Sequence, residues 1–207
     1  MMLFNIETNT FAPDYLLQDN QDNQNWVAVT DEEIDGISAS ITGGGAVWLE
    51  EGNIKYSGKA PSEYYVFDSK SKSFKVSEAK KTEFFKSKKE SLLSTLSDKT
   101  DKIKDGLLVG YPQAEIDSFY RQEKEALAWQ VNNKADTPML KQIAQIRNIP
   151  FDVLVQKVIE KSEQFALAVG AIIGQRQSFE DRLLALKNLE ELTELEQEIE
   201  AWTFNAN

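Results

Sequence analysis

The sequence predicts an α+β protein, with a small antiparallel β-rich N-terminal domain followed by an all-α helical domain. Short β-prone runs separated by turn residues between 46 and 76 indicate hairpins. From residue 113 to 187, apolar positions recur at steps of three and four, which is the period of helices with one buried face. The expected divisions are residues 1–76 for the β-rich domain, 77–110 for a helix and a linker, and 111–207 for the helical domain.

The first thirty residues carry scattered aromatic side chains and a polar stretch at 18–25, which together with Pro13 indicates a turn or loop rather than a regular element. The sequence TDEE at 30–33 is a capping box and predicts a short helix through about Ser40. The three glycines at 43–45 end that helix and supply the backbone freedom of a turn. They lack the Lys and Ser or Thr of a phosphate-binding loop, so the turn is the favoured interpretation.

Two hairpins are predicted next, at 46–56 around Gly52 and Asn53, and at 64–76 around the polar turn 69–72. Together they predict one small antiparallel sheet with an aromatic face. The aromatic side chains of that face are the candidate partner-binding residues, Trp48, Tyr64, Tyr65, Phe67 and Phe74. A small core with ordinary surface aromatics is the plainer explanation of these residues. Because a domain of about 75 residues can barely cover a sheet, part of this face is also a candidate docking surface.

A helix is expected at 78–96, with aromatic and leucine side chains near one side and lysines on the other, followed by a charged and then glycine-containing linker at 98–110. Another helix is expected at 113–129. Thr137 and Pro138 begin the next helix as N-cap and first helical residue.

Ile149 and Pro150 separate that helix from the longest one, which runs from 151 to 186 and keeps its apolar phase for roughly ten turns. A final glutamate-rich amphipathic helix is expected at 189–202. The long helix needs partners, and the shorter helices on either side are the natural ones.

Two features of the helical part invite a functional interpretation. Glu123 lies among apolar positions and is a candidate buried carboxylate, although a pairing with a nearby basic residue such as Arg121 is the more ordinary explanation. Ala166, Gly170 and Gly174 are spaced by four, which allows close approach of another backbone. We interpret this spacing as a tight internal crossing, with self-association as the less favoured use.

The composition excludes several classes of function. The chain has no Cys and no His, so it lacks thiolate nucleophiles, Cys-rich zinc sites and the usual general base. A net charge of −11 argues against non-specific nucleic-acid binding. Lysines cluster between 70 and 104 and glutamates between 190 and 200, and solvated helix faces explain both runs.

The longest apolar run, residues 165–174, is about half a bilayer span, and the N-terminus has no basic and apolar segment of the signal-peptide kind. The sequence therefore predicts a soluble cytoplasmic protein that neither crosses nor binds a membrane. No cofactor, metal or enzymatic activity is expected. A hydrolase acting on surface polysaccharide through two carboxylates is the weakest hypothesis, since no acidic pair stands out.

Short motifs in the front half resemble the phage tail-fibre assembly protein family. They are WVAVTDEE at 26–33, WLEEG at 48–52, and PSEYYVFD at 61–68, which leads into Phe74 and a helix. A tryptophan often stands in that family where this chain has Phe67 or Phe74. The back half looks like a helical domain often attached to such proteins, through the motifs YPQAEIDSF at 111–119, EALAW at 125–129, TP at 137–138 and GQRQ at 174–177.

The resemblance implies a chaperone that assists folding, trimerisation or assembly of a phage or prophage tail fibre, sometimes remaining bound to the fibre tip. Its partner would be the tail-fibre protein, in particular the C-terminal region of that fibre protein. The chain would act in the host cytoplasm or at the tail fibre of the virion. Homo-oligomerisation through the long helix is the second expected interaction. The alternative is a structural virion component, a fibre-tip or baseplate protein involved in receptor binding. The motifs do not identify which residues contact the fibre.

Overall fold

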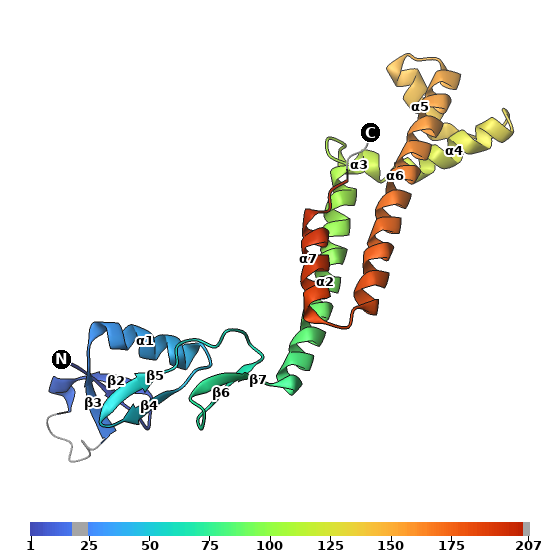
Figure 1. The fold of residues 1–207 in the computed structure, drawn as a ribbon. Coiled ribbons are helices and arrows are strands. Elements are labelled where there is room, and N and C mark those ends of the chain that lie inside the picture. The colour runs from blue at the N-terminus through green and yellow to red at the C-terminus, as the bar shows by residue number, and fades with distance from the viewer. Residues whose placement is uncertain (18–24, 205–207) are drawn as a thin grey trace. The chain divides into compact units, whose positions relative to one another are not determined.

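The computed structural model describes residues 1–17 and 25–204, which form two compact units, Met1–Lys88 and Lys89–Asn207. Strands occur in the first unit and most helices in the second, so the predicted α+β class is confirmed (Figure 1). The division between the units falls within a single helix, α2 (Glu78–Gly106). The polar turn predicted at 18–25 lies almost entirely outside the described residues.

In its described residues, the first unit contains three separate antiparallel sheets and one α-helix before α2. In chain order its elements are β1 (Met2–Asn5), β2 (Thr10–Pro13), the 3-10 helix η1 (Asp14–Leu16), β3 (Trp26–Val29), α1 (Asp31–Thr42), β4 (Val47–Glu50), β5 (Asn53–Tyr56), β6 (Tyr65–Asp68) and β7 (Ser73–Val76). The sheets have the strand orders β2-β1-β3, β4-β5 and β6-β7.

This arrangement corrects two sequence predictions. The two predicted hairpins exist, but they form separate sheets rather than one, and β1, β2 and β3 arise from residues for which no strand was predicted. A strand of four residues is too short for the alternation of apolar and polar side chains to be recognised in the sequence. The β1–β3 pairing also joins residues more than twenty positions apart, which local patterning does not reveal.

Helix α1 begins as the capping box predicts. The Glu33 N–H donates to Thr30 Oγ1 at 3.3 Å, and the Thr30 N–H donates to Glu33 Oε2 at 2.8 Å. Gly36 allows the ring of Tyr56 to lie directly against the helix, since a Cβ there would come within 2.2 Å of that ring. Helix α1 therefore packs on the β4–β5 hairpin, and it ends at Gly43 as predicted.

The core of the first unit is small. It consists of Phe4 from β1, Val29 from β3, Ile37 from α1 and Ile54 from β5, with partly buried neighbours around them. Each of these elements is too short to bury a face alone, so the core forms only when all four meet.

The second unit is helical throughout its regular structure in the described residues. After α2 its elements are α3 (Gln113–Ile116), α4 (Phe119–Val131), α5 (Pro138–Arg147), α6 (Phe151–Ala185) and α7 (Leu189–Ala201). The predicted linker is wrong over most of its length, because α2 continues ten residues beyond 96 to Gly106. Lys99 in this extension donates to the backbone oxygen of Glu200 in α7, and such a contact between distant residues is not visible in local sequence.

Helix α6 is long enough to pack against two groups of helices (Figure 1). Its first half packs with α4 and α5, around a core that includes Ala126, Leu140 and Leu154. Its second half carries the buried Ile172, Phe179 and Leu183, contacts α7, and accepts a hydrogen bond from Lys89 of α2 at the Leu184 backbone oxygen. The prediction that the long helix needs shorter partners on both sides is confirmed.

An ion pair joins α6 to α7, and a side-chain cap begins α7. Arg182 donates two hydrogen bonds of 2.6 Å to the carboxylate of Glu198, a bidentate pair that raises the pKa of Arg182 and lowers the pKa of Glu198. Asn188 caps α7, because its side-chain oxygen accepts the Glu191 N–H at 2.9 Å.

The middle of α6 contradicts one prediction. Nothing lies within 4 Å of a Cβ built at Gly170 or Gly174, so the predicted tight internal crossing at this stripe is wrong. Nearby Leu167 and Ile173 are 76% and 44% exposed. Self-association, the other use of the stripe, stays a prediction.

Candidate functional site

The β6–β7 hairpin brings aromatic side chains to one face of its sheet. Phe67 and Phe74 are direct cross-strand partners, as are Tyr65 and Val76. Because side chains alternate along a strand, these four residues share one face, and Val66, Asp68, Ser73 and Lys75 share the other. The rings of Phe67 and Phe74 meet edge to face, with centroids 5.5 Å apart and an angle of 74°.

Trp48 reaches this face from the other hairpin. Its ring stacks on Phe67 with a centroid distance of 5.4 Å and an angle of 26°. Because side chains alternate along a strand, Trp48 lies on the face of β4 opposite to the face that carries Val47 and Leu49. We call Trp48, Phe67 and Phe74 the aromatic cluster, and all three side chains are half-buried.

The other two predicted residues form a neighbouring group. Tyr64 and Tyr65 have centroids 5.3 Å apart, and Tyr64 also lies 5.5 Å from Phe84 at the start of α2. Both tyrosines are half-buried, and no ring contact joins them to the aromatic cluster in the described structure. The five candidate residues are thus divided into a group of three and a group of two.

A cation that the sequence analysis did not single out completes the cluster. Lys72 Nζ lies 4.6 Å from the ring centroid of Trp48, within the range of a cation–π interaction. Lys72 is in the β6–β7 turn and has a backbone φ of 52°, so the conformation of the turn sets the direction of its side chain toward Trp48. Sequence gives no direct signal for this contact, because Lys72 and Trp48 belong to different hairpins.

The turn itself is held by Asp68. Its carboxylate accepts from the Lys75 ammonium, from Ser71 Oγ at 2.9 Å and from the Lys70 N–H at 3.1 Å. These donors, Lys75 first, lower the pKa of Asp68 to about 2. Asp68 therefore stays ionised over the whole physiological range and orders the lysine-rich turn.

The aromatic cluster is not fully satisfied within the chain. The indole nitrogen of Trp48 is shielded from solvent and has no hydrogen-bond acceptor among the described residues. A buried donor without an acceptor costs about 1–3 kcal/mol. The stacking and cation–π contacts of the ring must offset this cost.

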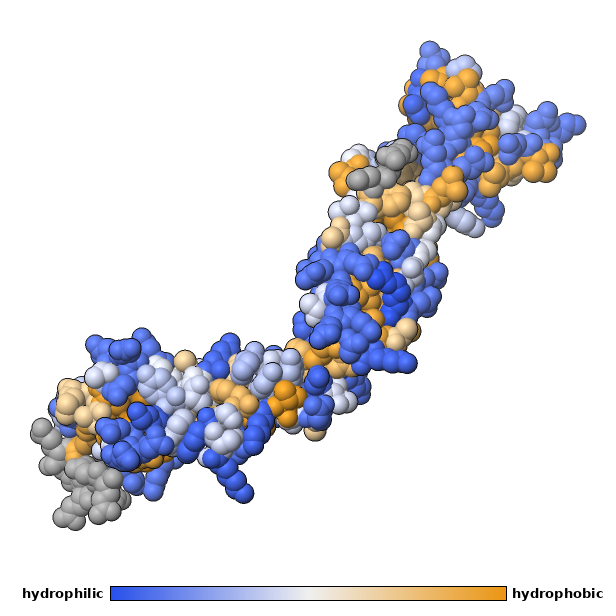
Figure 2. All heavy atoms as spheres, viewed as in Figure 1, coloured by the Kyte–Doolittle hydropathy of each residue, from blue (hydrophilic) through white to orange (hydrophobic). Residues whose placement is uncertain are grey.

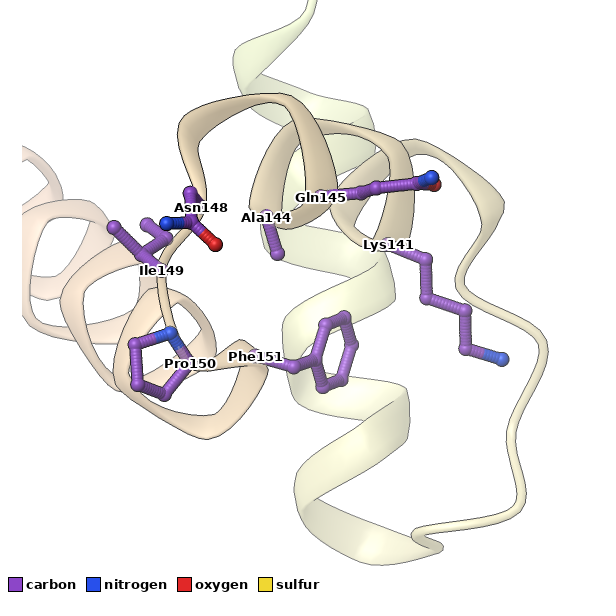
Figure 3. A pocket seen from close by; sticks show the side chains of 7 residues that line it. All are labelled: Lys141, Ala144, Gln145, Asn148, Ile149, Pro150 and Phe151. Carbon is purple, nitrogen blue, oxygen red and sulfur yellow. The ribbon is translucent and has the colours of Figure 1, made fainter.

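A concave surface lies between α5 and α6 (Figure 3). The groove has a volume of about 660 Å³ and is open to solvent. Its walls are mainly apolar, and the lining residues are Lys141, Ala144, Gln145, Asn148, Ile149, Pro150 and Phe151. Lys141 is the one ionisable side chain among them, so the groove lacks the paired groups that acid–base chemistry requires.

The carboxylate suggested by the sequence is not the buried one. Glu123 is half-buried, whereas Glu125 is 7% exposed. Glu125 accepts from Arg121 Nε at 3.1 Å and from the Leu140 N–H at 3.0 Å. It therefore caps the N-terminus of α5, where the Thr137 side chain, predicted as the cap, makes no hydrogen bond. Its role is structural.

No helix in residues 1–17 and 25–204 is long and apolar enough to span a membrane. Within the same ranges, no three acidic side chains gather in a way that could hold a metal ion.

Comparison with known proteins identifies one relative. An uncharacterized protein of Haemophilus influenzae is 67% identical to this chain over 66 residues, which is 97% of that protein and 32% of this chain. The chain belongs to the family of this Haemophilus protein. In addition, the HI1402 helical domain family matches residues 160–202, which comprise most of α6 and all of α7. No solved structure matches the chain significantly.

Proposed function

We propose that this chain is a chaperone that assists the folding, trimerisation or assembly of a phage or prophage tail fibre, and that the aromatic cluster contacts the fibre protein. The proposal rests on the resemblance of residues 26–33, 48–52 and 61–68 to tail-fibre assembly proteins. The latter two segments contribute Trp48 and Phe67 to the cluster. The observation that carries the proposal is the half-buried aromatic surface formed by two small hairpins.

The geometry suits a protein partner better than a small molecule. Half-buried aromatic side chains gain further burial when a partner covers them, and such residues are enriched where interfaces are strongest. Figure 2 shows hydrophobic and hydrophilic residues side by side over the β6–β7 hairpin, a mixture typical of interfaces formed between soluble proteins. No cofactor is needed for this role.

The physics of fibre folding explains why such a surface would be useful. Trimeric fibres depend on long-range strand pairing, which is slow and leaves strand edges and apolar surface exposed in intermediates. Exposed edges pair with other chains and aggregate. A partner that covers them in the host cytoplasm would raise the yield of assembled trimer, and it would stay at the fibre tip if release were slow.

Co-expression tests this proposal. The chain is produced together with a tail-fibre protein encoded in the same genome, and soluble, heat-resistant fibre trimer is quantified along with co-purification. We expect trimer to depend on the chain, and its yield to fall when Trp48 and Phe67 are both replaced by Ala. Tyr120→Ala is the matched control, since Tyr120 is 75% exposed and lies in the other unit.

Two results would contradict the proposal. Equal trimer yields with and without the chain would remove the chaperone role, and stoichiometric presence in purified particles would then favour the structural virion component. Normal trimer yield with a folded double variant would exclude the aromatic cluster as the contact surface while leaving the chaperone role in place.

A further inference from the structure

The hydrogen-bond pattern of the β6–β7 hairpin leaves one side of β7 open. The Ser77 N–H donates to the Tyr64 oxygen at 2.9 Å, which makes these two residues a hydrogen-bonded pair. Since such pairs alternate in an antiparallel ladder, Lys75 and Ser73 also point their backbone groups inward, toward β6. The N–H and C=O groups of Phe74 and Val76 therefore point outward, and no strand of the described chain pairs with them.

The opposite edge of the same hairpin is less available. By the same alternation Tyr65 and Phe67 point their backbone groups away from β7. The Tyr65 N–H already donates to the Ser62 oxygen at 3.0 Å, within the turn that precedes β6. Of the two edges, β7 offers the longer run of free donors and acceptors.

The two faces beside this edge differ in chemistry. Phe74 and Val76 lie on the face of the aromatic cluster, and Val76 is 40% exposed. Lys75 lies on the other face and is paired with Asp68 there, the turn adds Lys70, and Lys72 lies over Trp48 beside the aromatic cluster. A strand added at β7 would thus place alternate residues beside the apolar side chains of Phe74 and Val76 and beside the polar side chains of Ser73 and Lys75, with the lysines of the turn close to its end.

The charge of the hairpin is opposite to that of the chain. The segment from Tyr65 to Val76 contains three lysines and one acidic residue, Asp68, whereas the whole chain has a net charge of −11. Asp68 is engaged with Lys75 and with the turn. The hairpin is therefore a local basic site that attracts an acidic segment, while the rest of the chain repels one.

From these observations we infer that the outer edge of β7 binds an extended segment of alternating acidic and apolar residues by strand addition. Main-chain hydrogen bonds to Phe74 and Val76 supply affinity, and the lysines select acidic side chains. The inference deepens the proposed function and rests on it for the biological source of the segment, which would be an unpaired strand of the fibre protein.

A defined peptide tests the edge without any fibre. The probe is a fluorescently labelled (Glu-Val)4 peptide, and its binding to the full chain is measured by anisotropy at low and high salt. The (Lys-Val)4 peptide is the matched control. We expect the acidic peptide to bind more tightly, and its affinity to fall as salt screens the lysines. Equal binding of both peptides, or binding of neither, would overturn the inference.

Variants then separate strand pairing from charge. Val76→Pro removes an outward N–H without touching a bond to β6, and proline is tolerated at such edge positions. Val76→Ala keeps the N–H and is its control. Binding should be lost with Pro and retained with Ala, whereas equal binding by two folded variants would exclude strand addition. Replacing Lys70 and Lys72 together with Gln should weaken binding about fivefold, and an unchanged affinity would exclude charge selection.

The same variants distinguish this inference from the proposed function. If Val76→Pro abolishes peptide binding and also lowers the yield of fibre trimer, both stand. If the parent chain raises trimer yield but binds neither peptide, the chaperone role stands and strand addition at β7 fails. If the acidic peptide binds as described but the chain does not affect any fibre, the edge is a binding site and the chaperone role fails.

Discussion

Among the described residues, the first unit buries four hydrophobic side chains, Phe4, Val29, Ile37 and Ile54, whereas the second buries fourteen. The first unit instead keeps most of its large aromatic side chains half-buried. Since stability follows the apolar area removed from water, the second unit has the larger reserve of stability. The exposed large hydrophobic side chains, by contrast, are mostly in the second unit. The units therefore differ in how they place apolar groups: the helical unit separates a buried core from exposed side chains, whereas the sheet unit holds most of its aromatic rings between the two extremes.

The largest expected effect is the loss of a fully buried side chain in the helical unit. Ile199→Ala should lower the free energy of unfolding by about 2–5 kcal/mol, because Ile199 is completely buried and leaves a cavity. Leu184→Ala is the control, since Leu184 is 60% exposed. Urea unfolding followed by circular dichroism measures both, and equal losses would contradict the assignment of the core.

The next effect concerns the carboxylate that caps α5. Glu125→Ala should cost about 2 kcal/mol, because the buried Leu140 N–H loses its acceptor. Glu123→Ala changes the same residue type two positions earlier and should cost much less. A larger effect at Glu123 in the same unfolding measurement would show that the sequence-based choice was correct.

A smaller effect, of opposite sign, is expected in the middle of α6. Gly170→Ala and Gly174→Ala should each raise stability by about 1 kcal/mol, because a methyl group meets nothing within 4 Å and alanine favours helix. Sedimentation velocity of the same variants examines self-association through α6. If a variant instead loses stability, and a dimer formed by the parent chain disappears, another copy of the chain covers the stripe of small residues.

Two substitutions of Trp48 measure how much the aromatic cluster contributes to the free energy of unfolding. Trp48→Phe keeps a ring on Phe67 and removes the unpaired indole N–H, so stability should change by less than about 1 kcal/mol. Trp48→Ala removes the stacked ring and should cost more. If both variants unfold alike in urea, the stacking on Phe67 contributes nothing measurable to the fold.

The smallest effect is the pH dependence of the β6–β7 turn. The pKa of Asp68 falls from an ordinary 3.8 to about 2 in the folded hairpin, so the unfolded chain takes up the proton first as the pH falls. The stability that Asp68 contributes is therefore present above about pH 4 and is lost between pH 4 and 2. NMR titration of the Asp68 carboxyl measures its pKa in the folded chain, and urea unfolding at several pH values measures the change in stability. Asp68→Asn should abolish that dependence, and high salt should weaken it.

Local chemistry in the sequence was sufficient to predict several elements. The capping box at Thr30, the proline at 150 and the long apolar period of α6 each depend on neighbours within a few residues, and both elements, α1 and α6, form where predicted. The two hairpins were predicted for the same reason, although the tight turn of the first is centred on Glu51 and Gly52, one residue earlier than expected.

Other features depend on residues far apart in the chain. The β1–β3 pairing, the continuation of α2 beside α7, and the choice of Glu125 rather than Glu123 were settled by contacts that no local window contains. The same holds for the candidate site. The sequence nominated Trp48, Tyr64, Tyr65, Phe67 and Phe74 by residue type, but packing between hairpins separated three of them from the two tyrosines and added Lys72.

Sequence alone therefore determined the fold class and the elements with strong local signals, because capping, turn conformation and helical periodicity act over one or two turns of chain. Only the tertiary structure decided which aromatic rings meet, which carboxylate is buried and which strand edge stays open. Those outcomes depend on how short elements pack against one another, and packing energy is shared among residues that the chain keeps far apart.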